Sequence, residues 1–260
     1  MRPPFCLRDG NGGRVWSIVF HPATPPSVLA FLLICGFVVA ALLRGVWRSA
    51  QVEGYAPLAR TMGVAVGVIA WLGLLARLVA SGWVAAMPER LLIFGPGILL
   101  VSALVGFSRI GDWLARPVSI PWLLAFQGFR LPLELVLHSW VKQGTIPETM
   151  TWTGSNWDVI SGIVALGLAP LCRNSRAAAW TGNIIGFALL LNVGRVAVLS
   201  GPVAFGWADV TPKMLLPFYL PYALILPVCV GGALIGHIVL TRALLRPQSR
   251  AQPPPVARVN

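Results

Sequence analysis

Seven apolar stretches, separated by short loops that carry most of the arginines, fill the sequence between residues 27 and 240. A helix needs about 17 to 25 apolar residues to cross a bilayer. We therefore predict an all-α membrane protein with a bundle of about seven transmembrane helices, at 27–43, 61–80, 91–107, 119–141, 157–171, 179–199 and 214–240. The fifth stretch is short. It could be tilted less than its neighbours, could borrow flanking residues, or could be a re-entrant segment packed inside the bundle.

The two ends of the chain differ from this pattern. Residues 1–26 are polar and rich in Gly and Pro, and we expect a flexible tail. The transmembrane domain then covers 27–241, and residues 242–260 form a basic, Pro-rich tail that we expect to be disordered. The first apolar stretch is not predicted to be a signal peptide, because the polar tail before it is long and the stretch ends at Arg44.

The distribution of Lys and Arg around the apolar stretches predicts an orientation. One side of the membrane collects eleven of them: Arg44, Arg48, Arg60, Arg109, Arg116, Arg173, Arg176, Arg242, Arg246, Arg250 and Arg258. The other side has six, namely Arg2, Arg8, Arg14, Arg90, Lys142 and Lys213. Because basic loops stay in the cytoplasm, the C-terminus is predicted to be cytoplasmic and the N-terminus outside. The three tail arginines argue against this orientation.

Composition supports the same class. The chain is 57% hydrophobic and 11% charged, which is typical of a protein surrounded by lipid. The net charge of +12 lies at the ends of the apolar stretches, so the expected partner is the lipid bilayer and not nucleic acid. The sequence does not indicate an oligomeric state. The four cysteines have no paired spacing, and we interpret them as small apolar fillers.

The fourth stretch contains three ionisable residues at four-residue steps, Arg130, Glu134 and His138. This spacing places them on one face of a helix. Each charge near the middle of a bilayer costs about 2.5 to 3.5 kcal/mol, so these groups need partners, water or a ligand. We expect Arg130 to pair with Glu134, one turn away.

Further polar residues are predicted to share the outer half of the bundle. The candidate ligand-binding residues are Arg130, Glu134, His138, Asn156, Asp158 and Arg195. Three cations, Arg77, Arg130 and Arg195, face few carboxylates there, and a small anionic solute could balance them. In the alternative interpretation, Arg77 and Arg195 extend to the headgroups and Arg130 pairs with Glu134.

Metal and cofactor sites are not expected. Glu134 and His138 share a helix face, and Asp158 could complete a metal-binding set, but the pattern is weak. His237 is expected near the inner end of the last stretch, across the membrane from His138, so a haem held by these two histidines is not expected. Motifs for a serine or cysteine nucleophile, a P-loop or a dinucleotide are absent from the sequence.

Two pairs of glycines indicate close helix packing. Gly63 and Gly67, and Gly182 and Gly186, have the small-xxx-small spacing that lets membrane helices approach closely. The last stretch contains several prolines and is expected to bend.

The segment from Gln127 to Gly162 resembles a family of uncharacterised bacterial multi-pass membrane proteins. A Q-x-x-R-x-x-x-E helix is followed by G-x-I-P-x-x-M-T-x-x-G-x-N-x-D and then by a W-x-x-N-x-x-G helix. The matching positions are Gln127, Arg130, Glu134, Gly144, Ile146, Pro147, Met150, Thr151, Gly154, Asn156, Asp158, Gly162, Trp180, Asn183 and Gly186. The resemblance implies a bacterial inner-membrane location and no particular activity.

Three classes of function remain open from the sequence. The protein could bind or transport a small anionic or amphiphilic solute through Arg130, Arg195 and Glu134. It could be an intramembrane enzyme in which His138 and Asp158 act as acid and base and Glu134 orients the histidine. It could also be a structural or assembly protein with a purely structural polar interior.

Overall fold

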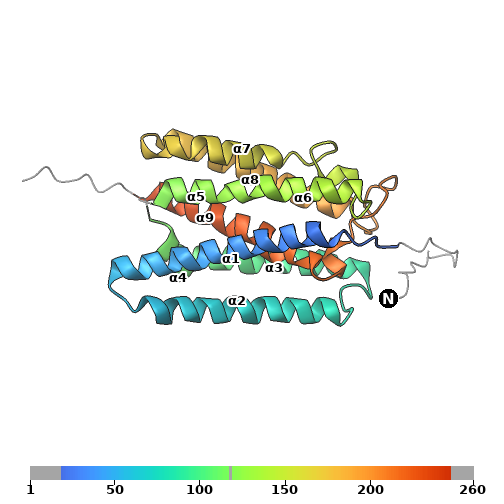
Figure 1. Ribbon diagram of the computed structural model, residues 1–260, viewed down its shortest axis with the longest axis horizontal. Helices are drawn as coiled ribbons and strands as arrows, with labels where there is room; N and C mark the ends of the chain where they lie inside the picture. Colours follow the sequence, from blue (N-terminus) through green and yellow to red (C-terminus); the bar gives the residue numbers. More distant parts are fainter. Residues whose placement is uncertain (1–18, 117–118, 247–260) are drawn as a thin grey trace, which may run out of the picture.

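The structure is a computed structural model that describes residues 19–116 and 119–246. Its regular elements in these ranges are helices, most of which run roughly parallel to the long axis (Figure 1). The α-helices are α1 (Pro25–Glu53), α2 (Pro57–Ala80), α3 (Leu91–Phe107), α4 (Arg109–Leu114), α5 (Ile120–Phe126), α6 (Arg130–Lys142), α7 (Val159–Leu168), α8 (Arg176–Leu199) and α9 (Gly231–Leu245). Short 3-10 turns join several of them, and a π-helical segment, Ile225–Val230, leads into α9.

Successive long segments alternate in direction along the bundle. We call the end at which α1, α3 and α9 finish the basic end, and the end at which α2, α6 and α8 finish the loop end (Figure 1). The first described helix starts at the loop end and the last one finishes at the basic end. This arrangement agrees with an odd number of traverses of the bundle.

Five helical segments in the described part are long and apolar enough to cross a membrane. They are Pro25–Glu53, Pro57–Ala80, Ile120–Lys142, Arg176–Leu199 and Tyr222–Leu245. Their outward faces are apolar, with Leu33, Val66 and Ile69 largely exposed, as expected for helices surrounded by lipid. Two shorter apolar helices, Leu91–Phe107 and Val159–Leu168, complete the seven predicted stretches. The structure is thus consistent with a membrane protein, and five crossings are the number that helix length supports.

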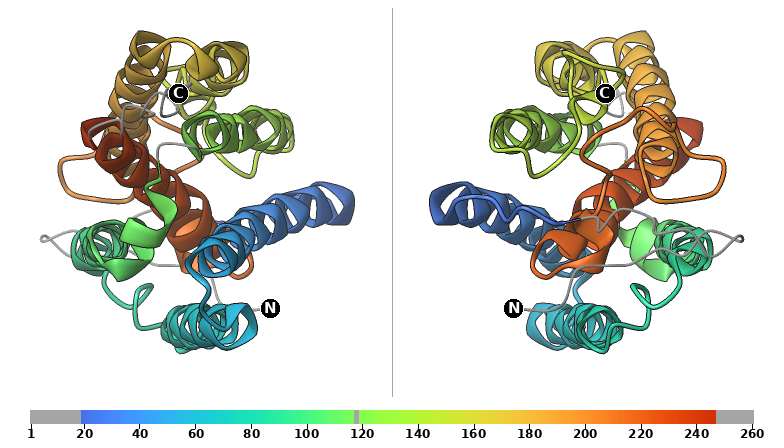
Figure 2. Two further views of the ribbon diagram at one scale, coloured as in Figure 1. Left: turned by 90° about the vertical axis from the view of Figure 1, so that its left-hand side faces the viewer. Right: turned by 90° about the vertical axis from the view of Figure 1, so that its right-hand side faces the viewer.

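The last segment lies at the centre of the bundle. Figure 2 shows α9 between the group formed by α5 to α8 and the group formed by α1 to α4. Small residues such as Gly231, Ala233, Gly236 and Ala243 are buried along it, which allows neighbouring helices to approach closely.

The prediction that this last helix begins near residue 214 was wrong. Residues 214–221 contain Pro217 and Pro221 and form only a 3-10 turn and irregular backbone, because proline lacks the N–H that a helix interior requires. The helical segment instead runs from Tyr222 to Leu245. It therefore begins eight residues later than predicted and also continues past residue 241, where we had expected the tail. Both predicted tails otherwise lie mostly outside the described residues.

Helix α7 covers only part of the bundle's length. Its ten residues span about 15 Å, half of a bilayer's apolar core of about 30 Å. Figure 1 shows that it stops short of the loop end, which α6 reaches. The chain from 143 to 157 covers the remaining distance, and because it folds back into the bundle we call it the re-entrant loop. It turns at Gly144, whose φ of 70° lies in the left-handed region, and it buries Ile146, Met150 and Asn156.

Only one of the two predicted glycine pairs lies at a close helix contact. A Cβ on Gly182 would meet Leu124 at 2.8 Å, and one on Gly186 would meet His237 at 2.7 Å. Gly63 and Gly67 have nothing within 4 Å of the same position, so the prediction of close packing there was wrong. The spacing is the same in both helices, but α2 lies at the periphery and α8 contacts α9.

Candidate functional site

Arg130 occupies the buried centre of the bundle, where four helices meet. The chain passes from α5 to α6 through a single 3-10 turn, and Arg130 follows that turn, near the middle of the Ile120–Lys142 segment. Its side chain is only 2% exposed. Nε donates a hydrogen bond of 2.7 Å to Asp158 Oδ2, and Nη2 forms an ion pair with Oδ1 of the same carboxylate. The two groups therefore meet side by side, in the geometry that favours Arg and carboxylate most.

The third guanidinium nitrogen reaches two other helices. Nη1 donates 2.8 Å to the backbone oxygen of Gly186 in α8, and it lies 3.4 Å from His237 Nε2 in α9. Gly186 makes this approach possible, because a side chain there would occupy the space of the His237 ring. All three nitrogens of Arg130 are thus in contact with protein groups.

Asp158 is positioned by its own local structure. It immediately precedes α7, so its place in the interior depends on the re-entrant loop. Ser161, one turn later, donates a hydrogen bond of 2.9 Å to Asp158 Oδ1. The side-chain oxygen of Asn156 accepts a hydrogen bond of 3.2 Å from the Asp158 backbone N–H. The carboxylate therefore accepts from Ser161 of α7 as well as from Arg130, and Asn156 holds the Asp158 backbone.

A chain of polar contacts continues from Arg130 toward the basic end. His237 Nδ1 lies 2.9 Å from Asn183 Oδ1, and Asn183 Nδ2 donates 2.7 Å to Thr241 Oγ1. These residues join α8 to α9. Nearby, Gln127 Nε2 donates 3.1 Å to the backbone oxygen of Ala233 and so joins the 3-10 turn before α6 to α9.

Glu134 does not pair with Arg130, and that prediction was wrong. Glu134 is buried, and its Oε1 accepts a hydrogen bond of 2.9 Å from Asn156 Nδ2, which also donates 2.9 Å to the backbone oxygen of Met150. The re-entrant loop therefore supplies the partner of Glu134, and Asp158, the residue that follows the loop, is the partner of Arg130. Sequence spacing placed Arg130 and Glu134 on one helix face, but the loop brought better-placed groups to each of them.

His138 lies one turn beyond Glu134 and does not join the contacts of Arg130, Asp158 and Glu134. Its ring stacks on Trp152 of the re-entrant loop, with ring centroids 4.3 Å apart. Its Nδ1 has no hydrogen-bond partner among the described residues. The imidazole thus packs against the loop and is joined to neither Glu134 nor Asp158 by a hydrogen bond in the described part of the chain.

Arg195 is not brought to the other predicted residues. Its side chain is exposed, donates hydrogen bonds to Asn192 in the preceding turn and lies over the Trp207 ring, 5.9 Å from the centroid. Arg77 is also exposed. The sequence gives the position of Arg195 along its helix but no information about which way that face of α8 points.

The cluster contains residues that sequence analysis did not place there. We define the polar cluster as Gln127, Arg130, Glu134, Asn156, Asp158, Ser161, Asn183, Gly186 and His237. His237 was expected near the inner end of the last stretch, and the later start of that helix places it beside Arg130 instead. The sequence signal that could have found Asn183 and His237 is a polar residue within an apolar helix. For Asn183 and Gly186, the N-x-x-G spacing was a second signal.

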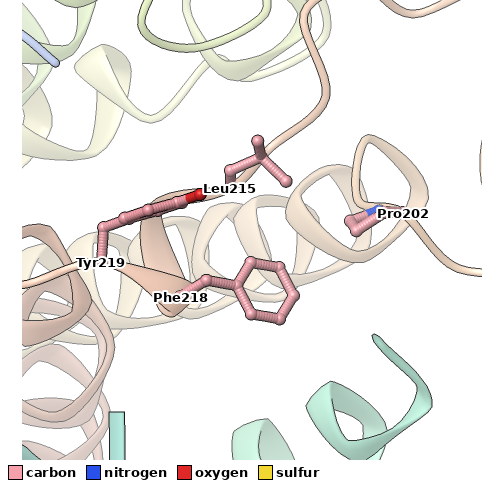
Figure 3. A pocket seen from close by; sticks show the side chains of 4 residues that line it. All are labelled: Pro202, Leu215, Phe218 and Tyr219. Carbon is pink, nitrogen blue, oxygen red and sulfur yellow. The ribbon is translucent and has the colours of Figure 1, made fainter. Parts of the chain in front are cut away.

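A small hollow lies at the loop end, away from the cluster. It measures about 10 Å³, room for roughly one water molecule, and Pro202, Leu215, Phe218 and Tyr219 line it (Figure 3). Its lining includes none of the candidate residues. Within residues 19–116 and 119–246, no group of three or more His, Cys, Asp or Glu side chains could hold a metal ion.

Two of the cysteines meet in the apolar core. Cys35 Sγ in α1 lies 3.9 Å from Cys229 Sγ in the π-helical segment, and both side chains are buried. Their separation of 194 residues explains why sequence spacing did not reveal the contact.

Comparison with known proteins gives no further assignment. No protein-family model, no curated protein and no solved structure matches the chain. Interpretation of the cluster therefore depends on its geometry.

Proposed function

We propose that this chain is a structural or assembly protein of a bacterial inner membrane and that the polar cluster is a fixed structural core. Its role in this proposal is to hold the re-entrant loop, residues 143–157, and helix α7 in place at the outer face. The loop is then the surface that the protein presents to the outside. The proposed topology has seven crossings, with the N-terminus outside and the C-terminus in the cytoplasm.

The observation that carries this proposal is the buried ion pair of Arg130 with Asp158. A cation that binds an anionic solute must offer donors to it, whereas each nitrogen of Arg130 already contacts Asp158, Gly186 or His237. The positive charge is balanced by a carboxylate from the same chain. A buried ion pair of this kind specifies one arrangement of the helices around it, since an unpaired charge in the interior costs several kcal/mol.

Hydrogen bonds from the cluster and from α8 also hold the re-entrant loop. A non-helical backbone inside the membrane is tolerated only where protein groups satisfy it. Asn156 binds Glu134 and the Met150 carbonyl, and Asn192 of α8 donates 2.9 Å to the Ser155 carbonyl. Thr149 and Ser200 share a hydrogen bond of 2.7 Å. The loop is therefore fastened to both α6 and α8.

A second candidate function is the binding of a small solute from the outer face. It is favoured by two buried atoms on one face of α6, Glu134 Oε2 and His138 Nδ1, which have no hydrogen-bond partner among the described residues. Such atoms suit a solute that offers hydrogen-bond donors and acceptors. The exposed Arg195 would act separately, at the entrance. This candidate places the solute at Glu134 and not at Arg130.

The test replaces the gene with a variant that lacks the central charges, Arg130→Leu together with Asp158→Leu. Under the structural proposal this variant accumulates in the membrane at wild-type amounts and rescues the deletion strain. Loss of rescue at a normal amount of folded protein would contradict it, because the charges would then act on something other than each other. Glu134→Gln in the same strain tests the second candidate, which predicts lost rescue with unchanged folding.

A further inference from the structure

The basic end of the bundle carries many more cations than carboxylates. Its described carboxylates are Glu53 and Asp112. Its described cations are Arg44, Arg48, Arg60, Arg109, Arg116, Arg173, Arg176, Arg242 and Arg246. Each of these two carboxylates is already shared by two arginines. Glu53 binds Arg60 and Arg116, and Asp112 binds Arg242 and Arg246.

Two arginines of α1 are left without an acidic partner. Arg44 and Arg48 are exposed, and neither makes an ion pair in the part of the chain that the structure describes. Trp47, between them, is 37% exposed. Spacings of three and four residues place all three side chains on one face of the helix. The opposite face, with Val46 and Ala50, is buried against the bundle.

The length of α1 fixes the depth of this face. Residues 25–43 are free of charged side chains and span about 28 Å, close to the apolar thickness of a bilayer. The complete helix has 29 residues and spans about 43 Å, so its last ten residues lie beyond the apolar core. Arg44, Trp47 and Arg48 thus stand at the level of the lipid headgroups. Figure 2 shows that the start of α1 stands away from the bundle while its end lies beside α2 and α4, and the exposed side chains of Arg44, Trp47 and Arg48 leave this face of the end open to lipids.

We propose that the face formed by Arg44, Trp47 and Arg48 binds the phosphate of an anionic phospholipid headgroup. A guanidinium group can donate two parallel hydrogen bonds to two oxygens of one phosphate. A tryptophan at the headgroup level anchors the helix beside it. The excess positive charge of the basic end attracts the anionic lipid to this face. The inference rests on the membrane insertion proposed above, but it is independent of the role of the polar cluster.

The experiment uses the full-length protein in nanodiscs of phosphatidylcholine or of phosphatidylcholine mixed with phosphatidylglycerol. Native mass spectrometry then measures the affinity for each lipid. Each arginine near an anionic surface contributes about fivefold to the affinity. In the variant R44Q/R48Q, the affinity for phosphatidylglycerol should therefore fall about thirtyfold, while the affinity for phosphatidylcholine stays the same. R77Q/R195Q removes two exposed arginines elsewhere and should remain within about twofold of the wild type.

Several outcomes would overturn the inference. An unchanged affinity in R44Q/R48Q, or an equal loss in both double variants, would show that net charge and not this face attracts the lipid. Release of bound phosphatidylglycerol by equimolar inorganic phosphate would identify a free-phosphate site instead. If R44Q/R48Q does not fold, R44K/R48K replaces it, and its affinity should fall less than thirtyfold but measurably, because lysine keeps the charge and loses the paired contact. Failure of the wild type to enter either nanodisc would instead contradict membrane insertion.

Discussion

Arg130 and Asp158 are separated by 28 positions in the chain, yet Arg130 Nε donates to Asp158 Oδ2 at 2.7 Å in the buried centre of the bundle. The contact joins the middle of a long helical segment to the residue that precedes a short one. It thereby sets the depth at which the re-entrant loop ends and α7 begins. The helices around it carry the remaining contacts of the guanidinium.

The first prediction separates the true partner of Arg130 from the neighbouring acid. Asp158→Asn removes the charge that balances Arg130 and should destabilise the protein by about 3 to 5 kcal/mol. Glu134→Gln keeps an oxygen that can accept from Asn156 and should cost less than about 1 kcal/mol. Equilibrium unfolding in mixed detergent micelles measures both. A larger loss of stability for Glu134→Gln than for Asp158→Asn would show that Glu134, and not Asp158, is the partner of Arg130.

The second prediction concerns the close contact of α8 with α9. Gly186→Ala places a methyl group 2.7 Å from His237 Cε1, and overpacking of this kind costs about 1 to 3 kcal/mol. Gly194→Ala in the same helix meets nothing within 4 Å and should be neutral or stabilising, because alanine favours a helix over glycine. The comparison uses the same micelle assay. Equal effects of the two substitutions would argue against the packing of His237 on Gly186.

The third prediction concerns the fastening of the re-entrant loop. Asn156→Ala removes both hydrogen bonds of its amide N–H group, leaves Glu134 without a donor, and should cost about 1 to 3 kcal/mol. Hydrogen exchange should increase in residues 143–157 more than in α8. The control, Asn174→Ala, changes an exposed asparagine and should leave exchange in the loop as it is in the wild type. Uniform acceleration over the whole bundle in Asn156→Ala would show that the loop is not a separate unit.

The fourth prediction is the topology. Reporter fusions after Arg116 and after Arg176 should indicate the cytoplasm, and a fusion after Thr153 should indicate the outside, because the basic end collects the arginines. Alkaline phosphatase, which is active only outside, and a fluorescent protein that folds inside give complementary readouts. The reverse pattern would invert the orientation and place the re-entrant loop in the cytoplasm.

Much of the helical framework could be predicted because hydrophobicity determines which segments enter lipid. The boundaries of α2 and α3 lie close to those of the predicted stretches 61–80 and 91–107. The last segment was less predictable, since its apolar composition continues across residues 214–221 while Pro217 and Pro221 prevent a helix there. Hydropathy alone does not register that difference.

The candidate site was predictable only in part. Arg130, Glu134, Asn156 and Asp158 do come together, because a buried charge inside an apolar helix must find polar partners. Arg195 does not join them, because the rotation of α8 depends on packing at positions such as Gly186, which a single sequence does not reveal. The partners within the cluster depend on the course of the re-entrant loop, and loop geometry is not encoded in helical spacing.

A double-mutant cycle on Arg130 and Asp158 tests the central claim most directly. Arg130→Leu and Asp158→Leu should each lower the free energy of unfolding by about 3 to 5 kcal/mol, because each leaves one charge buried without its partner. The double variant should lose less than about 2 kcal/mol, so that the two effects are strongly non-additive. If the two losses simply add in the double variant, Arg130 and Asp158 are not partners and the polar cluster is not the structural core described here.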